Sequence, residues 1–517
     1  MTGTLRITSD CARLVAMFDW AVRTARTHVY PAGWTGPVNA DEHRPLGTGT
    51  APYLPTYHAG YRHRSAFYAR DFAHQAVGAH LLGLALENAT MLRAFAASAT
   101  AGHGHHPVWA CNFDGTFHTI DYHGPERFVR ELPAVFELVE TVLRLYRWTG
   151  DRTLVDDPVL WAFCRTTVTE FVRRRTAGSP VARGTGGGIF DGTASYHELS
   201  EERLVEAGDG IATQYRAYLA AAELATARGE HAFAARCAEL ARELKRYFNE
   251  EWSRVRPADG QARRNGRGEH PADTVRGYTG DGRPVTGWGR EGSWFMPLKR
   301  IIDAGPRNER YLDYIDEEAA GADAPPNAEA YTYLPEVFFA HGRAETAWRW
   351  MTAVHDLRDR PHPVPEQGRN GDYPELSFTL VGQTVEGLLG LLPDAPAHRL
   401  STLPGLPGAI GRVEVRDIPF GDGLLTLRHD GDGSTLTRST GAELSWEARL
   451  PGAHTALTVD GQPRTPEVRT DGGVTYSRTT VRVAPGRACT VRVARPAEAV
   501  PPVGPGGRRP RDADSGR

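Results

Sequence analysis

The feature that most constrains the fold of this chain is the spacing of its apolar residues. From about residue 10 to about residue 392 they recur with the 3.6-residue period of amphipathic helices. From Val413 to Val493 they instead alternate with a period of two between Gly/Asp-rich turns, as in half-buried strands. This pattern predicts a mainly helical part followed by a smaller part built of strands.

Within the helical part, the connections between expected helices alternate in length. Long loops rich in Gly, Pro and aromatic residues precede the helices that begin near residues 71, 129, 208, 291, 328 and 375, whereas the other links are short. Six antiparallel pairs connected in this way describe an (α/α)6 toroid, so the fold class is mainly α, and its long loops open on one face. We expect the functional site on that face. The twelve expected helices cover residues 10–28, 71–84, 86–101, 129–148, 157–176, 208–228, 231–251, 291–303, 307–319, 328–341, 344–357 and 375–391.

Changes in composition set the predicted domain boundaries. The Pro/Gly-rich run 404–407 separates a catalytic toroid domain over residues 1–400 from a small antiparallel β-sandwich domain over 401–497. Sequences such as Asp-Gly-Asp-Gly at 430–433 are typical of hairpin turns between its strands. Residues 498–517 are rich in Pro, Gly and Arg and lack apolar side chains, which predicts a disordered tail.

Charge and hydropathy exclude several classes of partner. Sixty Lys and Arg residues against 63 Asp and Glu residues give a net charge of −3, without a sustained basic stretch, which argues against nucleic-acid and anionic-membrane partners. The chain lacks an apolar run of membrane-spanning length and a signal-peptide pattern near its start, so a soluble cytoplasmic protein is expected. The five cysteines are far apart and suit buried thiols. No cofactor is expected, and the oligomeric state is left open.

Acidic and aromatic residues gather where the six long loops lead into helices. A carboxylate at a helix start satisfies free N–H groups and needs no further role. Capping does not require aromatic rings, however, whereas a sugar site needs flat apolar faces for stacking and charged groups for hydroxyls. The candidate catalytic residues are Asp71, Asp209, Glu291, Glu329 and Glu375. The candidate substrate-binding residues are Arg70, His74, His123, Trp288, Arg290, Trp294, Tyr331 and Tyr373.

Five arginines of these loops have two possible roles. Each can be a structural partner of a neighbouring acid, or it can bind the substrate. In the second role they suit an anionic sugar. These arginines are Arg62, Arg64, Arg70, Arg290 and Arg369.

The hairpin count and five local blocks resemble the six-hairpin glycosidase superfamily, the toroidal hydrolases that include glucoamylases, α-L-rhamnosidases and glucuronyl hydrolases. The blocks cover residues 69–75, 206–210, 289–294, 327–331 and 373–379. The resemblance implies a general acid and a base or nucleophile on either side of a glycosidic bond. In many relatives the acid begins the third inner helix and the base the sixth, which gives Asp209, or Glu206 beside it, and Glu375. Asp71, Glu291 and Glu329 remain rivals.

These considerations predict a glycoside hydrolase that needs no metal or cofactor. One carboxyl must hold its proton while the other must not, and opposed inner helices favour the wider separation that leads to inversion. The expected cytoplasmic location suggests an exo-acting enzyme for a small oligosaccharide or glycoside, for which a uronide and a rhamnoside are both open.

Three other interpretations were weighed. A polysaccharide or oligosaccharide lyase would use His74, His123, Tyr331 or Tyr373 for β-elimination beside a uronate carboxylate, with loop arginines neutralising that carboxylate. A sugar-binding protein without catalysis would retain the groove but not the acid pair. The histidines at 103–106 invite a metal site, but no acid or cysteine lies at ligand spacing, and the sequence is typical of an exposed loop.

Overall fold

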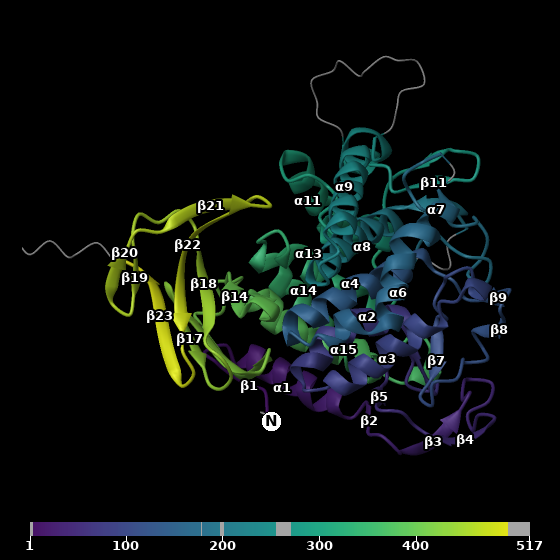
Figure 1. The fold of residues 1–517 in the computed structure, drawn as a ribbon, viewed down its shortest axis with the longest axis horizontal. Coiled ribbons are helices and arrows are strands. Elements are labelled where there is room, and N and C mark those ends of the chain that lie inside the picture. The colour runs from purple at the N-terminus through teal and green to yellow at the C-terminus, as the bar shows by residue number, and fades with distance from the viewer. Residues whose placement is uncertain (1–3, 177, 197–200, 255–269, 495–517) are drawn as a thin grey trace, which may run out of the picture.

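The computed structural model describes residues 4–176, 178–196, 201–254 and 270–494, so the predicted tail lies outside the described residues. Helices dominate the chain up to residue 388, and strands make up most of the part that follows (Figure 1). The described chain therefore has a helical domain and a sheet domain. None of its helices is long and apolar enough to cross a membrane.

Each of the twelve predicted stretches contains a helix. Six inner helices follow the long loops: α2 (Ala69–Leu81), α4 (Leu132–Thr149), α8 (Gly208–Ala227), α10 (Glu291–Leu298), α13 (Tyr333–Phe339) and α15 (Pro374–Gly382). The other six are α1 (Ala12–Arg26), α3 (Ala85–Ser98), α6 (Pro158–Thr166), α9 (His231–Tyr247), α11 (Pro306–Ala320) and α14 (Ala344–Leu357). Short helices also occur at α5 (Thr153–Asp156), α7 (Val172–Arg175) and α12 (Ala328–Tyr331).

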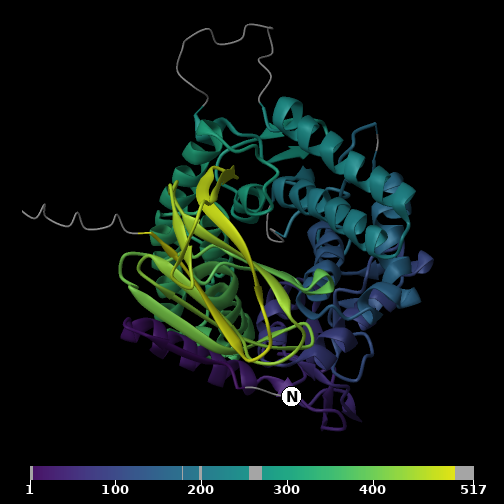
Figure 2. The same ribbon diagram turned by 60° about the vertical axis from the view of Figure 1, so that its left-hand side comes forward.

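Contacts between the inner helices form a closed ring. In order around the ring, α2 packs on α4, α4 on α8, α8 on α10 and α10 on α13. The ring closes because α13 packs on Gln383–Leu388, a π-helical continuation of α15, and α15 packs on α2. The outer helices α1, α9, α11 and α14 pack on inner helices, and together the helices surround the middle of the domain in Figure 2. Burial follows from this arrangement: all nine residues of α15 are buried, whereas only four of the seventeen residues of α9 are.

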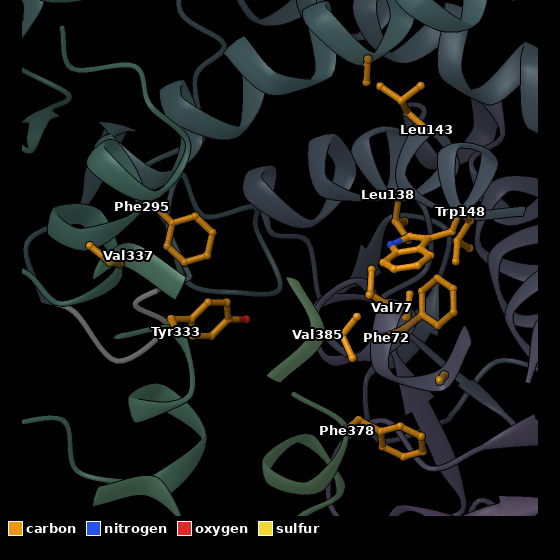
Figure 3. Close-up of a cluster of buried hydrophobic side chains, with 14 of the residues drawn as sticks. Phe72, Val77, Leu138, Leu143, Trp148, Phe295, Tyr333, Val337, Phe378 and Val385 are labelled. Atoms are coloured by element: carbon orange, nitrogen blue, oxygen red, sulfur yellow. The ribbon is translucent and has the colours of Figure 1, made fainter. Parts of the chain in front are cut away.

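The hydrophobic core lies between these helices. Figure 3 shows Phe72, Val77, Trp148 and Phe378 gathered on one side of the close-up and Phe295 on the other, all within one continuous core cluster. The helices α2 and α15 approach each other closely at Gly78, where an added Cβ would lie 2.0 Å from the backbone oxygen of Phe378. Closure of the ring therefore requires the absence of a side chain at this position.

The long loops contain short strands that tie them together. β6 (Ala66–Tyr68) pairs with β7 (Ala110–Asn112), and β10 (Leu204–Ala207) pairs with β11 (Gly277–Thr279), so loops far apart in sequence are held side by side at the helix starts. The remaining strands in these loops are β2 (Val29–Tyr30), β3 (Thr35–Val38), β4 (Gly49–Pro52), β5 (Thr56–Tyr57), β8 (Tyr122–Gly124), β9 (Arg127–Phe128) and β12 (Pro284–Val285).

The sheet domain consists of two sheets that pack on each other. One has the order β1 (Arg6–Ser9), β15 (Arg412–Phe420), β16 (Gly423–Asp430), β17 (Gly433–Arg438), β23 (Arg487–Val493), β19 (Leu457–Val459) and β20 (Gln462–Arg464). The other has the order β13 (Leu391–Asp394), β14 (Arg399–Thr402), β18 (Leu444–Pro451), β22 (Val474–Val483) and β21 (Glu467–Asp471). Alternate residues of β16 and β18 are buried, as the period of two predicted.

Two features of the sheets differ from the sequence prediction. The N-terminal strand β1 pairs with β15, more than 400 residues later, although only the later part of the chain was expected to form strands. β14 and β18 are parallel, not antiparallel, because the chain passes through β15, β16 and β17 of the other sheet between them.

The sheet domain contacts the ends of the helices that lie opposite the long loops. The backbone N–H of Gly421 donates to the oxygen of Trp148 (2.9 Å), near the C-terminus of α4. The side chain of His429 is hydrogen-bonded through Nε2 to the oxygen of Leu389 (3.0 Å), just beyond the continuation of α15. The sheets thus support one end of the ring and leave the helix N-termini free for a site.

We predict that Gly78→Ala destabilises the protein by about 1–3 kcal/mol, because the new methyl group must displace the backbone of α15. Gly382→Ala is the matched control on the facing helix, since a Cβ there has its nearest neighbour at an ordinary 3.7 Å. The control should be neutral or stabilising by up to about 1 kcal/mol through helix propensity. Urea unfolding of both variants provides the measurement, and equal effects would contradict the tight approach.

Candidate active site

A cavity of about 170 Å³ lies among the N-termini of the inner helices. Its walls combine carboxylates, arginines and aromatic rings, the combination that the long loops suggested. The lining residues are Tyr61, Tyr68, Arg70, Asp71, Trp109, Tyr196, Arg290, Glu291, Pro326, Asn327, Glu329, Ala330, Tyr373 and Glu375.

Four carboxylates of the cavity occupy the first turns of helices. Asp71 belongs to α2, Glu291 to α10, Glu329 to α12 and Glu375 to α15, and all four are buried. Free N–H groups and the positive end of the dipole stabilise an acid at such a position. Because the helices form a ring, these four local positions converge on one space.

Glu375 is held by an imidazole from a neighbouring helix. His74 Nδ1 makes a short contact with Glu375 Oε1, and His74 Nε2 lies 2.8 Å from Glu336 Oε1. The imidazole also stacks on Tyr333, with ring centroids 3.8 Å apart. Burial opposes a charge on His74, but the carboxylates of Glu336 and Glu375 outweigh it and raise the His74 pKa to about 9. At neutral pH, Glu375 therefore faces an imidazolium.

The surroundings of Asp71 instead disfavour a charge on its carboxyl. Its Oδ1 accepts a hydrogen bond from the Tyr373 hydroxyl at 2.5 Å. Burial and the nearby charge of Glu375 raise the Asp71 pKa to about 7, although the Tyr373 hydroxyl and Arg70 act against this increase. The cavity thus contains one carboxyl with a pKa near neutral beside another that contacts a cation.

Glu291 is bound by Arg70 from the opposite part of the ring. The Arg70 Nη2 donates to Glu291 Oε1 at 3.0 Å, and its guanidinium lies over the Tyr196 ring, 4.5 Å from the centroid. The other oxygen, Oε2, is buried without a hydrogen-bond partner among the described residues. One oxygen of Glu291 is thus held by a guanidinium, and the second is available to accept a hydrogen bond from a ligand.

Glu329 and Arg290 complete the charged wall. Glu329 Oε2 lies 3.2 Å from Nε2 of His362, whose ring stacks on Tyr373. Arg290 precedes Glu291 with backbone angles φ 48° and ψ −116°, a conformation that strains a residue with a side chain. No residue in the described part of the chain forms a hydrogen bond or ion pair with its guanidinium.

Beneath the cavity, the interior of the ring contains further paired charges. Lys299 Nζ lies 2.6 Å from Glu137 Oε1 and 2.9 Å from Glu140 Oε2. Arg216 also donates to Glu140 (2.8 Å), and the Glu137 carboxylate accepts the Tyr196 hydroxyl (2.6 Å). The Lys299 pKa is raised, because these two carboxylates outweigh the effect of burial. This network supports the floor of the site.

Seven of the thirteen predicted site residues line the cavity, and the other six lie elsewhere. Asp209 is fully buried outside the lining, where Oδ2 accepts hydrogen bonds from the Ser195 hydroxyl (2.8 Å) and the Tyr196 N–H (2.7 Å). Burial raises its pKa to about 6, and those hydrogen bonds oppose the shift. Asp209 therefore secures the loop segment at Ser195 and Tyr196 rather than facing the cavity.

The other five predicted residues make their own contacts. His74 lies behind Glu375, as described above. Trp294 is completely buried against Trp288 (centroids 5.6 Å apart), and Trp288 donates through Nε1 to the oxygen of Asp323. Tyr331 packs on Trp350, and His123 stacks on Phe190. None of these rings lines the cavity.

Sequence reasoning missed several residues that shape the site. Trp109 lines the cavity and donates through Nε1 to Glu131 (2.7 Å). It stands just before β7, which pairs with the strand leading into α2, but only the tertiary pairing reveals this proximity. Glu336 lies within α13, and nothing in the sequence around it indicated that it would contact His74. Tyr61, Tyr68 and Tyr196 belong to loops that the sequence had singled out.

The histidine-rich loop after α3 is not exposed, contrary to the prediction. His103 and His106 are buried, because His103 Nδ1 bonds the oxygen of Ser98 (2.6 Å) and His106 packs on Phe171. Within the described residues, no group of three or more His, Cys, Asp or Glu side chains is placed to hold a metal ion.

No protein-family model and no curated protein matches this sequence. Solved structures match over most of its length. The α-L-rhamnosidase from Dictyoglumus thermophilum has a TM-score of 0.55 at 10% identity, covering 94% of this chain and 50% of that chain. A rhamnosidase from Bacillus sp. GL1 has a TM-score of 0.55 at 11% identity, covering 85% and 41%. The α-L-rhamnosidase from Aspergillus terreus has a TM-score of 0.52 at 11% identity, covering 93% and 50%.

These similarities concern the fold. The chain spans half or less of the length of the three rhamnosidases, and only about one aligned residue in ten is identical. They confirm the fold resemblance to the six-hairpin glycosidases that the sequence suggested. The reaction has to be argued from the residues of this chain.

The pairing of His74 predicts a pH-dependent stability. A folded-state pKa of about 9 against 6.5 for the free side chain gives a stabilisation that is fully present below pH 6.5 and is lost as pH rises through 9. It amounts to about 3 kcal/mol at most. In the wild type, the free energy of unfolding should therefore fall as pH rises from 6.5 to 9. This fall should be absent in His74→Asn, and urea titrations at several pH values provide the measurement.

His80 on the same helix provides the control. Burial lowers its pKa to about 4, so it stays neutral over this pH range, and His80→Asn should retain the wild-type slope of stability against pH. Parallel pH profiles for wild type and His74→Asn would contradict the imidazolium assignment.

Proposed function

We propose that this protein is a glycoside hydrolase in which Asp71 is the general acid and Glu375 the catalytic base. The observation that carries the proposal is a pair of buried carboxyls in contrasting environments in one small cavity. Asp71 has a pKa of about 7, and Glu375 contacts the His74 imidazolium. Divergent environments for two neighbouring acids are the arrangement that glycosidic bond cleavage requires.

The proposal extends to the architecture. We assign the helical domain over residues 1–400 as an (α/α)6 toroid and the domain over 401–497 as a β-sandwich. Three strands that begin before residue 401, β1, β13 and β14, are added to this sandwich. The closed order of contacts among six inner helices supports the toroid. The two packed sheets with alternating burial support the sandwich.

The chemistry follows from the protonation states. The protonated carboxyl of Asp71 gives its proton to the glycosidic oxygen as the bond from that oxygen to the anomeric carbon breaks. The carboxylate of Glu375 takes a proton from a water molecule whose oxygen bonds to the anomeric carbon from the other face. A free sugar and an alcohol result, and the proton returns from Glu375 to Asp71 through solvent. Tyr373, Thr332 and His74 hold the two carboxyls throughout.

The assignment of the acid differs from the sequence-based expectation. Asp209 is committed to Ser195 and Tyr196 and does not line the cavity, whereas Asp71 does. Glu291 is less suited because one of its oxygens already accepts a hydrogen bond from Arg70. We assign Glu291 to binding of a sugar hydroxyl through its unpartnered Oε2, together with Arg70 as its positioning residue.

The dimensions of the cavity support an exo-acting enzyme. At about 170 Å³ it is smaller than the roughly 300–1,000 Å³ of sites for drug-sized ligands, so it suits a single sugar ring. The rings of Tyr61, Trp109 and Tyr373 supply flat faces in its wall. A terminal residue of a glycoside or short oligosaccharide is therefore the proposed substrate.

Lyase chemistry has weaker support from the same residues. His74 is protonated and bound on both sides by carboxylates, so it cannot take a proton from a substrate. His123 and Tyr331 do not line the cavity, and the Tyr373 hydroxyl donates to Asp71. A lyase would form products with the ultraviolet absorbance of a conjugated C=C bond, whereas we expect none.

The acid and base assignments predict different responses to the leaving group. On the best substrate of an aryl glycoside screen, Glu375→Gln should lower kcat by about 100-fold or more for every leaving group. Asp71→Asn should lower kcat to a similar extent for substrates with poor leaving groups. It should leave kcat nearly unchanged for a nitrophenyl glycoside, because nitrophenolate departs without protonation. Because burial and Glu375 disfavour the ionised form of Asp71, Asp71→Asn should not lower the melting temperature at pH 8.

The wild-type enzyme provides the internal control. Its kcat/KM should fall as pH rises through about 7, when Asp71 in the free enzyme loses its proton, and this fall should be absent in Asp71→Asn. Equal loss for good and poor leaving groups would assign Asp71 to substrate binding instead. Full activity of both variants would exclude catalysis at this cavity and leave a sugar-binding protein.

We expect the first-formed product to have the inverted anomeric configuration. Asp71 and Glu375 begin neighbouring inner helices, and packed helix axes lie about 8–10 Å apart. That spacing suits the roughly 6.5–9.5 Å carboxyl separation that admits a water molecule, rather than the roughly 5–5.5 Å of retaining pairs. Proton NMR of the hydrolysis before mutarotation provides the measurement, and net retention would show that Glu375 acts as a nucleophile.

A further inference from the structure

Resting on the hydrolase proposal, we infer that the sugar carries a carboxylate and that Arg290 recognises it, so that the substrate is a uronide. The observations are the unpaired guanidinium in the wall of the cavity, the pairing of the other charges around it, and the fixed, strained backbone that presents it. The unpaired guanidinium and the strained backbone do not depend on the acid and base assignments.

Most of the loop arginines that suggested an anionic ligand have an acidic partner. Arg62 pairs with Asp372 (3.3 Å), Arg64 binds Glu42 through two hydrogen bonds (2.9 and 2.6 Å), and Arg70 binds Glu291. Of the two arginines that line the cavity, Arg70 is therefore paired with an acid of the protein, and Arg290 is the one available to a ligand. Nothing in the described chain neutralises it.

The acids that line the cavity have other partners. Asp71 holds a proton near neutral pH, Glu291 is paired with Arg70, Glu329 contacts His362, and Glu375 contacts the His74 imidazolium. No acid lies within ion-pair distance of Arg290 among the described residues. A carboxylate brought by the ligand would complete the pairing of charges in the site.

The backbone holds Arg290 in a conformation that a glycine would adopt more readily. Its φ of 48° lies in the region that non-glycine residues rarely occupy. The Arg290 carbonyl accepts the N–H groups of Ser293 (2.7 Å) and Trp294 (3.0 Å) at the start of α10, and Gly289 before it has no room for a Cβ beside Arg276. A strained arginine in a cavity wall indicates that its side chain is needed there.

One guanidinium suits a carboxylate better than it suits a phosphate. The planar fork of an arginine matches two carboxylate oxygens, with a single negative charge neutralised by a single positive charge. A phosphate dianion would retain excess negative charge in a wall that already contains four acidic side chains. Both ligands are oxyanions, so the experiment includes inorganic phosphate as a separate arm.

Calorimetric titration of the full chain with free sugars tests the inference. The panel is glucuronate, galacturonate, mannuronate and iduronate, each against its neutral hexose, together with inorganic phosphate. Wild type should bind at least one uronate about 10- to 100-fold more tightly than the matching hexose, the range expected for a charge-assisted hydrogen-bonded pair. Arg290→Gln should abolish this preference and leave hexose binding unchanged.

Two further variants separate recognition from stability. Arg290→Gly removes the guanidinium and relieves the backbone strain, so it should lose the uronate preference with an unchanged or raised melting temperature. Arg283→Gln is the matched control, because Arg283 precedes the same helix but is exposed and paired with Asp281, and it should bind like wild type.

The inference is overturned if wild type binds every uronate no better than its hexose, or if Arg290→Gln and Arg290→Gly keep the preference. It is also overturned if phosphate alone shows Arg290-dependent binding, which would identify a phosphate site. These outcomes are distinct from failure of the hydrolase proposal, in which the uronate preference would be present and no aryl uronide would be cleaved.

Discussion

The structure depends on neutralising carboxylates that are buried inside a ring of helices. Isolated buried charges are costly by several kcal/mol each, so a ring with an acidic interior is stable only if cations enter it as well. The pairs run from the cavity downward: His74 with Glu375 and Glu336, Lys299 with Glu137 and Glu140, Arg216 with Glu140, and Arg144 with Glu386. The same pairing that permits folding places the carboxyls of the cavity in different electrostatic environments.

Much of this arrangement could be predicted from the sequence, because it depends on local signals. Helical periodicity and loop length placed all twelve helices and the face on which the cavity lies. Acids in first helical turns identified four cavity carboxylates, Asp71, Glu291, Glu329 and Glu375, because a closed ring brings all inner N-termini together. The period-two pattern identified the later strands for the same local reason.

The parts that could not be predicted depend on contacts distant in sequence. Asp209 has the same local setting as Asp71, a first-turn acid after a long loop, yet Ser195 and Tyr196 fold back to occupy it. Glu336 resembles a solvent-facing helix residue until the ring places His74 beside it. Strand β1 has no local partner at all and pairs with β15 only when the domains come together.

Lys299, one of only two lysines in the chain, occupies a position that an arginine would fit poorly. Of 60 basic residues, only Lys245 and Lys299 are lysines, so arginine is the default cation wherever either would serve. At residue 299, however, one charge must fit between two carboxylates within the ring, and a compact ammonium with three donors can do so where a broad planar guanidinium would spread the helices. Of the two lysines, Lys299 thus marks a position where the shape of the cation matters as well as its charge.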